Sequence, residues 1–187
     1  MEQRHLSIVG FGKNRAEADF YPTPESTTRA LLEREVFEGN IWECACGDGQ
    51  MSKVLREYCP IVFSSDIRED DSIDGSKGID FLKSDKIFNN IITNPPYRYA
   101  KEFVIHSKKC STNKIAMLLK LVFLEGKGRY EMFQDIKFPL KKILVFCRRV
   151  NFLSEKDPRG EKSSTMAIAW FIWDKKYIGK PYLEWIK

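Results

Sequence analysis

The sequence predicts an α/β fold, with a mostly parallel sheet of seven strands, helices on both faces and an antiparallel last strand. Short apolar segments alternate with amphipathic helical segments, which favours parallel strands joined by crossover helices. The stretch 115–121 is apolar except at Lys120, as in a strand covered on both faces. The last two predicted strands, 142–147 and 166–173, lack a helix-length connection, which favours an antiparallel pair.

The first predicted helix begins after Thr23, whose hydroxyl can cap its N-terminus. Pro24 takes the first helical position, where a missing N–H costs nothing, and Gly39 ends the helix. A strand at 41–45 and a glycine turn at 47–49 follow. The second helix is expected from the helical spacing of Met51, Val54, Leu55 and Tyr58.

The middle of the chain continues the alternation of strands and helices. A strand at 61–63 leads to Asp66, and an acidic, glycine-containing loop follows at 67–78. Two proline residues stop a buried strand after Thr93. The other elements expected here are a short strand at 79–82, the buried strand at 87–93, a helix at 98–109 and a short helix at 128–135.

Composition indicates one globular domain over residues 1–187, in which 1–19 is expected to be flexible. The 187 residues are 43% hydrophobic and 30% charged, which suits a chain that buries a core. No apolar run reaches the roughly 20 residues of a membrane helix, and the N-terminus lacks the apolar stretch of a signal peptide. We therefore expect a cytoplasmic protein.

The cysteines do not predict a disulfide framework or a metal site. There are five of them, an odd number at irregular spacing. Cys44 and Cys46 have no second Cys or His pair to complete a zinc site, because the chain holds only two histidines. Buried free thiols are the expectation, with no metal.

Charge is divided unevenly between the two halves of the chain. Residues 1–93 hold 11 Lys and Arg against 17 Asp and Glu, a net charge of −6. Residues 94–187 hold 20 against 9, a net charge of +11. The basic half suits a polyanion such as nucleic acid, although a lopsided solvated surface would give the same numbers.

Asn94-Pro95-Pro96-Tyr97, directly after a buried strand, is the strongest chemical signal. The amino group of a base is a poor nucleophile because its lone pair is delocalised into the ring. An Asn side-chain oxygen and the carbonyl of the following Pro can accept hydrogen bonds from the two N–H groups of such an amine. Proline makes the turn rigid, and an aromatic residue at the fourth position can stack on the base. The alternative is a proline turn in which Tyr97 only packs.

These four residues resemble the [DNS]-P-P-[FYW] motif of S-adenosylmethionine-dependent amino-methyltransferases, including DNA adenine-N6 and cytosine-N4 enzymes. Residues 43–49, which follow the first strand, resemble motif I of the same family (E-P-x-x-G-x-G). Glu43, Gly47 and Gly49 match it, while Cys44 stands where the family often has Pro. The glycines let the backbone approach a ligand closely, and an acidic residue suits a sulfonium cation.

The resemblance implies further cofactor-binding residues in the same order along the chain. Asp66 ends the second strand, where an acid accepts the ribose hydroxyls, and Asp80-Phe81 matches the motif that binds the cofactor adenine. The segment 20–24 resembles the F-x-T-P element beside the methionine moiety. The complete expected cofactor set is Phe20, Tyr21, Thr23, Glu43, Cys44, Gly47, Gly49, Asp66, Asp80, Phe81 and Asn94, and the expected catalytic set is Asn94, Pro95, Pro96 and Tyr97.

Two later segments resemble small phage-type adenine methyltransferases, namely 121–130 and 148–152. Their basic side chains can hold phosphates, and Phe152 can stack or wedge beside a flipped base. Solvated cations and a core aromatic residue are the alternatives. The candidate nucleic-acid-binding residues are Lys127, Arg129, Arg148, Arg149 and Phe152.

The resemblance implies a class I (Rossmann-like) methyltransferase fold without a separate target-recognition domain. The activity it implies is transfer of a methyl group from S-adenosylmethionine to an exocyclic amino group of a nucleic-acid base, adenine N6 in DNA first. A monomer or weak dimer that binds nucleic acid and no membrane is expected. The alternatives are an RNA-base or protein-glutamine N-methyltransferase, and an inactive nucleic-acid-binding module with the same fold.

Overall fold

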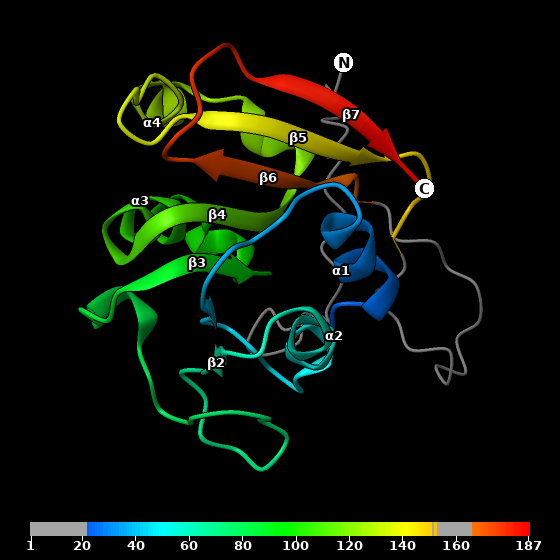
Figure 1. Cartoon of the computed structure of the whole chain (residues 1–187), viewed down its shortest axis with the longest axis vertical. Helices are drawn as coiled ribbons and strands as arrows, with labels where there is room; N and C mark the ends of the chain where they lie inside the picture. The colour runs from blue at the N-terminus through cyan, green and yellow to red at the C-terminus, as the bar shows by residue number, and fades with distance from the viewer. Residues whose placement is uncertain (1–21, 151, 153–165) are drawn as a thin grey trace, which may run out of the picture.

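The structure, a computed structural model, describes residues 22–150, 152 and 166–187. In this part of the chain seven strands form one sheet, in the order β2-β1-β3-β4-β6-β5-β7 (Figure 1). The strands are β1 (Ile41–Glu43), β2 (Val62–Ser64), β3 (Phe88–Thr93), β4 (Ser111–Lys120), β5 (Leu140–Phe146), β6 (Ile168–Asp174) and β7 (Tyr182–Ile186).

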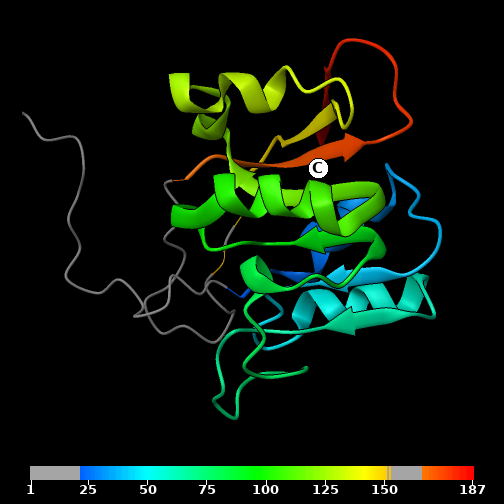
Figure 2. The same ribbon diagram turned by 90° about the vertical axis from the view of Figure 1, so that its left-hand side faces the viewer.

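Helices cover both faces of this sheet (Figures 1 and 2). The α-helices are α1 (Glu25–Leu32), α2 (Gln50–Tyr58), α3 (Ala100–Cys110) and α4 (Tyr130–Phe133). The short 3₁₀ turns are η1 (Phe81–Lys83), η2 (Tyr97–Tyr99), η3 (Leu121–Leu124) and η4 (Lys127–Arg129). Among the described residues, none of the helices has both the length and the apolar character needed to cross a bilayer.

Strand directions confirm the predicted fold class. β1 pairs in parallel with β2 and β3, and β3 pairs in parallel with β4, so these four strands end at the same edge of the sheet. β6 is antiparallel to both β4 and β5, which is the antiparallel arrangement expected at the end of the chain. The prediction did not include β7, an edge strand that follows β6 and pairs in parallel with β5.

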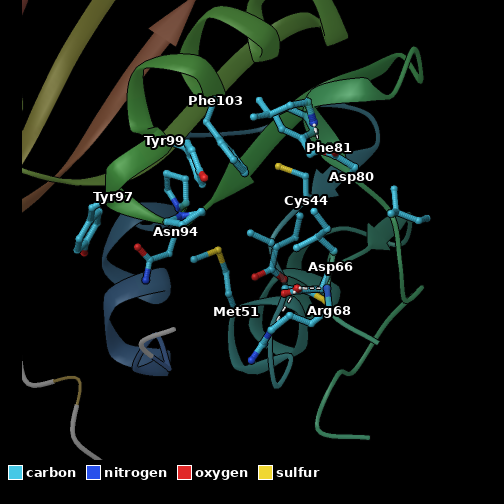
Figure 3. Close-up of a pocket in the computed structure, with 18 of the residues that line it drawn as sticks. Cys44, Met51, Asp66, Arg68, Asp80, Phe81, Asn94, Tyr97, Tyr99 and Phe103 are labelled. Atoms are coloured by element: carbon cyan, nitrogen blue, oxygen red, sulfur yellow. Dashed lines mark hydrogen bonds and ion pairs between the residues drawn. The ribbon is translucent and has the colours of Figure 1, made fainter. Parts of the chain in front are cut away.

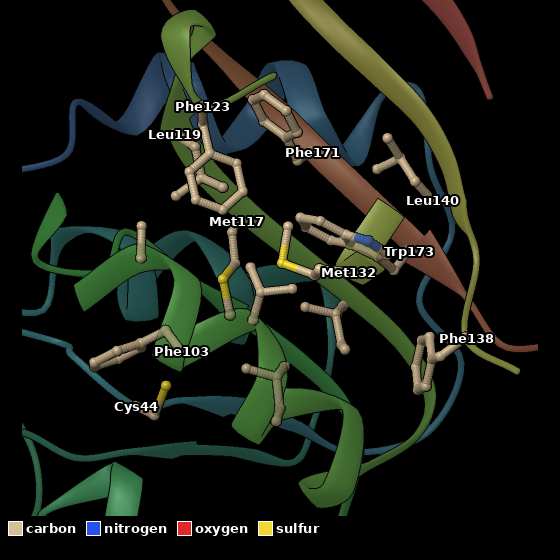
Figure 4. Close-up of a cluster of buried hydrophobic side chains, with 14 of the residues drawn as sticks. Cys44, Phe103, Met117, Leu119, Phe123, Met132, Phe138, Leu140, Phe171 and Trp173 are labelled. Carbon is tan, nitrogen blue, oxygen red and sulfur yellow. The ribbon is translucent and has the colours of Figure 1, made fainter. Parts of the chain in front are cut away.

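Two apolar clusters sandwich the sheet, because successive side chains of a strand point to opposite faces. In β4, Ile115, Met117 and Leu119 belong to the cluster under α3 and α4, which Figure 4 shows. Ala116 and Leu118 belong to the cluster under α1 and α2. The strand predicted at 115–121 is therefore buried on both faces over residues 115–119.

Two local predictions near the start of the described chain are wrong. α1 ends at Leu32 and does not reach Gly39, and Glu35, beyond its end, binds lysine side chains of the sheet. Thr23 does not cap α1, since the capping position is held by Pro24 and no side chain caps the helix. The hydroxyl of Thr23 instead accepts a hydrogen bond from the side chain of Asn94.

The short strand predicted at 79–82 is also wrong. Asp80 accepts a hydrogen bond from the N–H of Leu82 and starts the 3₁₀ turn η1. Short polar side chains favour such local bonds to the backbone over strand pairing. Beyond the end of β2, Ser65 and Ser76 form an isolated parallel β-bridge.

A buried cluster of charged side chains joins the connection between α1 and β1 to strands β4 and β5. The side chain of Glu35 is 4% exposed and lies 2.5 to 3.0 Å from the amines of Lys114, Lys141 and Lys142. Burial raises the pKa of Glu35, but the hydrogen bonds from the three lysines outweigh it and hold the pKa below its ordinary value. Lys142, 5% exposed, also donates to the Arg34 carbonyl.

We predict that Glu35→Gln lowers the free energy of unfolding by about 3 kcal/mol at pH 7, because it leaves buried ammonium groups without their counter-charge. Since the pKa of Glu35 is lowered on folding, its contribution is complete above its ordinary value of 4.5 and is lost as the pH falls below it. The difference between variant and wild type in urea unfolding should shrink from pH 7 to pH 3. Glu33→Gln, at an exposed neighbouring position, is the control. An equal effect of both substitutions would contradict the prediction.

Candidate active site

A cavity of about 480 Å³ lies at the edge of the sheet where β1, β2 and β3 end (Figure 3). The segments that line it are 43–46, 66–68, 79–82 and 94–99, with additional contributions from Thr23, Asp48, Met51 and Phe103. The cavity brings together these predicted site residues: Thr23, Glu43, Cys44, Asp66, Asp80, Phe81, Asn94, Pro95, Pro96 and Tyr97. Phe20 and Tyr21, also predicted, lie outside the described residues.

The predicted glycine turn joins β1 to α2 beside this cavity. Gly47 and Gly49 have φ angles of 55° and 79°, in the left-handed region that favours glycine. A side chain at position 49 would collide with the carboxylate of Asp74, from the loop at 67–78. The same loop donates the N–H of Asp74 to the Gly47 carbonyl at 3.0 Å, so the turn is held from outside as well as from β1.

Asp66, directly after β2, fixes the glycine turn. Its Oδ2 accepts from the N–H of Gly47 at 2.9 Å, and its Oδ1 accepts from the N–H of Arg68 at 2.9 Å and from Nε of Arg68 at 3.3 Å. These three bonds use most of the acceptor capacity of the carboxylate. The ribose contact expected from the resemblance stays a prediction, whereas the clamp on Gly47 is a role that sequence reasoning missed.

Asp80 and Phe81 form another wall of the cavity. Asp80 accepts from the N–H of Leu82 at 3.1 Å and pairs with Lys83 at 3.0 Å. Phe81 is 2% exposed, and its ring lies 5.0 Å from the rings of both Trp42 and Phe103. The position of Phe81 is therefore set by the aromatic core rather than by the 3₁₀ turn alone.

Glu43 is a buried carboxyl group in the lining. Ser52 donates a short hydrogen bond to it, and Ser52 in turn lies beside Ser64. Burial raises the pKa of Glu43 to about 8, and the hydrogen bond from Ser52 opposes the shift only in part. Glu43 is therefore mostly protonated at neutral pH, and a cation in the cavity would favour its charged form.

Cys44 and Cys46, in the segment 43–49 that contains the glycine turn, remain thiols. Burial raises the pKa of Cys44 well above its ordinary range and raises the pKa of Cys46 to about 12. Thiolate nucleophiles need a lowered pKa, so neither residue is suited to covalent catalysis. All five cysteines are free, as expected, and Cys147 differs from the other four in being exposed.

Asn94 to Tyr97 connect β3 to the turn η2 at the cavity. The amide Nδ2 of Asn94 donates to the hydroxyl of Thr23 at 3.0 Å. The Pro96 carbonyl accepts from the N–H of Tyr99 at 2.9 Å, which commits it to η2. In the view of Figure 3, Asn94 lies between Tyr97 on one side and Met51 and Asp66 on the other.

Tyr97 contacts the amine of Lys120, a residue that was not among the predicted site residues. Lys120, the last residue of β4, places its amine 4.8 Å from the centre of the Tyr97 ring. The ring also packs against the apolar cluster under α1 and α2. One face of Tyr97 is therefore occupied, which restricts where a base could stack. The lysine that follows the apolar run 115–119 was the signal for Lys120.

The candidate nucleic-acid-binding residues separate into two groups. Lys127, Arg148 and Arg149 are exposed. Arg129 lies over the ring of Phe123 at 5.0 Å and donates to the Val122 and Glu125 carbonyls, so it holds the η3–η4 segment together. Phe152 is 6% exposed and belongs to the core cluster under α1 and α2. For Arg129 and Phe152 the structure favours the packing alternative.

We predict that the wild type loses stability relative to Glu43→Gln as the pH rises from 5 to 8. The pKa of Glu43 is raised from 4.5 to about 8 on folding, so its contribution is complete below 4.5 and is lost as the pH rises through 8. The free energy of unfolding of the wild type, relative to that of Glu43→Gln, should fall by on the order of a few kcal/mol. Urea unfolding without added ligand measures it, and Glu69→Gln, at an exposed position, is the control. Parallel pH curves for wild type and Glu43→Gln would contradict the prediction.

No protein-family model matches the chain, and no curated protein matches its sequence. Solved structures do match. A protein assigned as the modification subunit of a type I restriction enzyme from Vibrio vulnificus YJ016 superimposes with a TM-score of 0.64 at 14% identity, over 90% of this chain and 47% of that one. The chain thus spans about half the length of this relative. A protein assigned as an RNA methyltransferase from Pyrococcus horikoshii has a TM-score of 0.64 at 14% identity, over 90% and 93% of the two chains.

A third match is a protein from Listeria monocytogenes assigned as a class I S-adenosylmethionine-dependent methyltransferase. Its TM-score is 0.62 at 13% identity, over 92% of this chain and 68% of that one. At such low identity the likeness concerns the fold. Together with the strand order and the cavity at the carboxyl edge of the sheet, it shows that this chain has the class I methyltransferase fold.

Proposed function

We propose that the protein transfers a methyl group from S-adenosylmethionine to an exocyclic amino group of a nucleic-acid base, adenine N6 in DNA first. One observation carries the proposal: the Asn94 to Tyr97 turn and the glycine turn with its acidic neighbours border the same cavity. A methyl donor and an acceptor amine must lie in contact for direct transfer. The proposal is supported by the position of both turns, which are far apart in the chain, at one cavity.

The cavity suits S-adenosylmethionine, which carries a sulfonium cation, an amino group and an adenosine. Four carboxyl groups line it, from Glu43, Asp48, Asp66 and Asp80. Ile67, 61% exposed, offers an apolar surface beside Asp66, where an adenine ring would lie. The volume of about 480 Å³ is within the range of small-ligand pockets. When bound, the cofactor would supply an electrophilic methyl group.

The roles of the protein groups follow from the chemistry of the amine. The side-chain oxygen of Asn94 and the carbonyl of Pro95 accept its two N–H groups and direct the lone pair toward the methyl donor. Asn94 acts as an acceptor and not as a base, because the proton leaves after transfer, when the nitrogen has become acidic. With Cys44 and Cys46 held as thiols, methyl transfer proceeds without a covalent enzyme intermediate, and positioning and desolvation supply most of the rate.

Charge favours a nucleic acid as the polymer. Residues 94–187 carry a net charge of +11, and Arg98, Lys127, Arg148 and Arg149 are exposed. Exposed cations bind phosphates irrespective of sequence and position the polymer. In duplex DNA the target base must leave the stack to reach Asn94. The similarity to a protein assigned as a restriction-enzyme modification subunit supports DNA.

We predict that Asn94→Ala removes at least about 2–3 kcal/mol of transition-state stabilisation, because one preorganised acceptor is lost. The measurement is nucleoside analysis of DNA and RNA after incubation with labelled S-adenosylmethionine. It identifies the polymer, the base and the dependence on Asn94 in one experiment. Asn113→Ala, in β4 at the opposite edge of the sheet, is the control and should retain wild-type activity. Methylation at a carbon atom, or full activity of Asn94→Ala, would overturn the proposal.

RNA is the second candidate polymer, since a protein assigned as an RNA methyltransferase is equally similar in structure. The Asn-Pro-Pro-Tyr turn recognises a planar amino group and not the polymer, so a protein glutamine amide is a further alternative.

We predict that duplex DNA competes for binding better than folded RNA at the same salt concentration, and that both affinities fall with salt. Preferential competition by RNA would move the assignment to RNA. If calorimetry detects no binding of S-adenosylmethionine, the chain is a binding module without catalysis.

A further inference from the structure

Two tyrosines lie in the turn η2, and they differ in how much of the side chain a ligand can reach. Tyr97 packs against the apolar cluster under α1 and α2, and the amine of Lys120 lies 4.8 Å from its ring centre. The hydroxyl oxygen of Tyr97 is buried. In Figure 3 Tyr97 lies apart from the other labelled side chains. Much of the Tyr97 side chain is therefore already used in contacts within the protein.

Tyr99 is the more accessible of the two. It is 42% exposed and lines the same cavity, and in the view of Figure 3 it lies between Asn94 and Phe103. Its backbone N–H donates to the Pro96 carbonyl at 2.9 Å, and the residue holds the capping position of α3. The backbone is thus fixed at both sides, so that the ring is held at the rim of the cavity.

Charge separates the side of the cavity on which Tyr99 lies from the acidic side. Three aspartate carboxyl groups contribute to the lining, from Asp48, Asp66 and Asp80. In Figure 3 Asp66 and Asp80 lie on one side of the view and Tyr99 on the other. The guanidinium of Arg98, an exposed residue that also lines the cavity, lies 4.6 Å from the centre of the Tyr99 ring. Carboxylates suit a cationic cofactor, whereas a guanidinium suits the phosphate of a nucleotide.

We propose that Tyr99, rather than Tyr97, stacks on the target base, while Arg98 covers the other face of the ring and binds a phosphate of the same strand. This inference rests on the proposed function and names the residues that hold the base. It differs from the family resemblance, which gives the stacking role to the fourth residue of the Asn-Pro-Pro-Tyr motif. Stacking on an aromatic ring is tolerant of base identity, so Tyr99 contributes affinity without selecting adenine.

The first test of this inference uses single-stranded oligo(dA), which presents unpaired adenines whatever the target sequence is. We expect Tyr99→Leu to weaken the Kd for oligo(dA) about tenfold and to lower kcat/KM for methyl transfer to mixed-sequence duplex DNA by a similar factor, because the stack is lost. Tyr99→Phe keeps the ring and should stay within about twofold of wild type. Tyr58→Leu, at an exposed position on α2 outside the cavity lining, is the matched control.

The role of Arg98 has a separate signature in the salt dependence. Arg98→Gln removes one phosphate contact, so the slope of log Kd for oligo(dA) against log salt concentration should fall by about 0.7, the value for one contact with a single strand. Tyr99→Leu should leave this slope unchanged, because a stack releases no counterions. An unchanged slope in Arg98→Gln would contradict the phosphate contact.

Calorimetry with S-adenosylmethionine separates a stack on the base from a stack on the cofactor. The Kd for the cofactor should change less than about twofold in Tyr99→Leu. A loss of cofactor affinity as large as the loss of rate overturns the inference, and so does unchanged oligo(dA) binding in Tyr99→Leu. If the wild type binds the cofactor, and binds oligo(dA) through Tyr99, but methylates no amine, the proposed function fails while the stacking role of Tyr99 stands.

Discussion

The direction of four parallel strands is the constraint on which the cavity depends. β1 lies between β2 and β3, so the segments that follow these three strands leave the sheet side by side. The glycine turn after β1 therefore meets Asp66 after β2, and Asn94 after β3 lines the cavity beside them. The bond from the Gly47 N–H to Asp66 locks the first two segments together at 2.9 Å. A one-residue slip in the pairing of β1 would turn Glu43 to the opposite face of the sheet and destroy this arrangement.

The two edges of the sheet handle buried charge in different ways. At the cavity, four carboxyl groups contribute to the lining, and burial keeps Glu43 largely protonated by raising its pKa to about 8. At the opposite edge, Glu35 is ionised because lysine amines surround it. The first arrangement keeps a buried carboxyl group largely neutral, whereas the second keeps one ionised through its ion pairs with lysines.

The far edge also contributes to the cavity indirectly. Glu35 holds the connection between α1 and β1 against the lysines of β4 and β5. α1 in turn packs on the sheet through Ala30 and Leu31 and carries the Pro22-to-Pro24 segment at its start. The hydroxyl of Thr23 is thereby brought to Asn94. A charge cluster at one edge of the sheet thus supports the placement of a side chain at the other.

The sequence by itself determined the fold class and about half of the cavity lining, because alternating apolar segments and residues at strand ends are local patterns that a parallel sheet converts into proximity. It did not determine the end of α1, the 3₁₀ turn at Asp80, the edge strand β7 or the partner of Thr23. The predicted cap at Thr23 was outweighed by a hydrogen bond with the distant Asn94, whereas the predicted strand at 79–82 was outweighed by the local bond from the Leu82 N–H to Asp80. The burial of Phe152, the clamp on Gly47 and the cation on Tyr97 likewise came from tertiary structure. Each depends on contacts between distant segments, and no pattern within either segment encodes its partner.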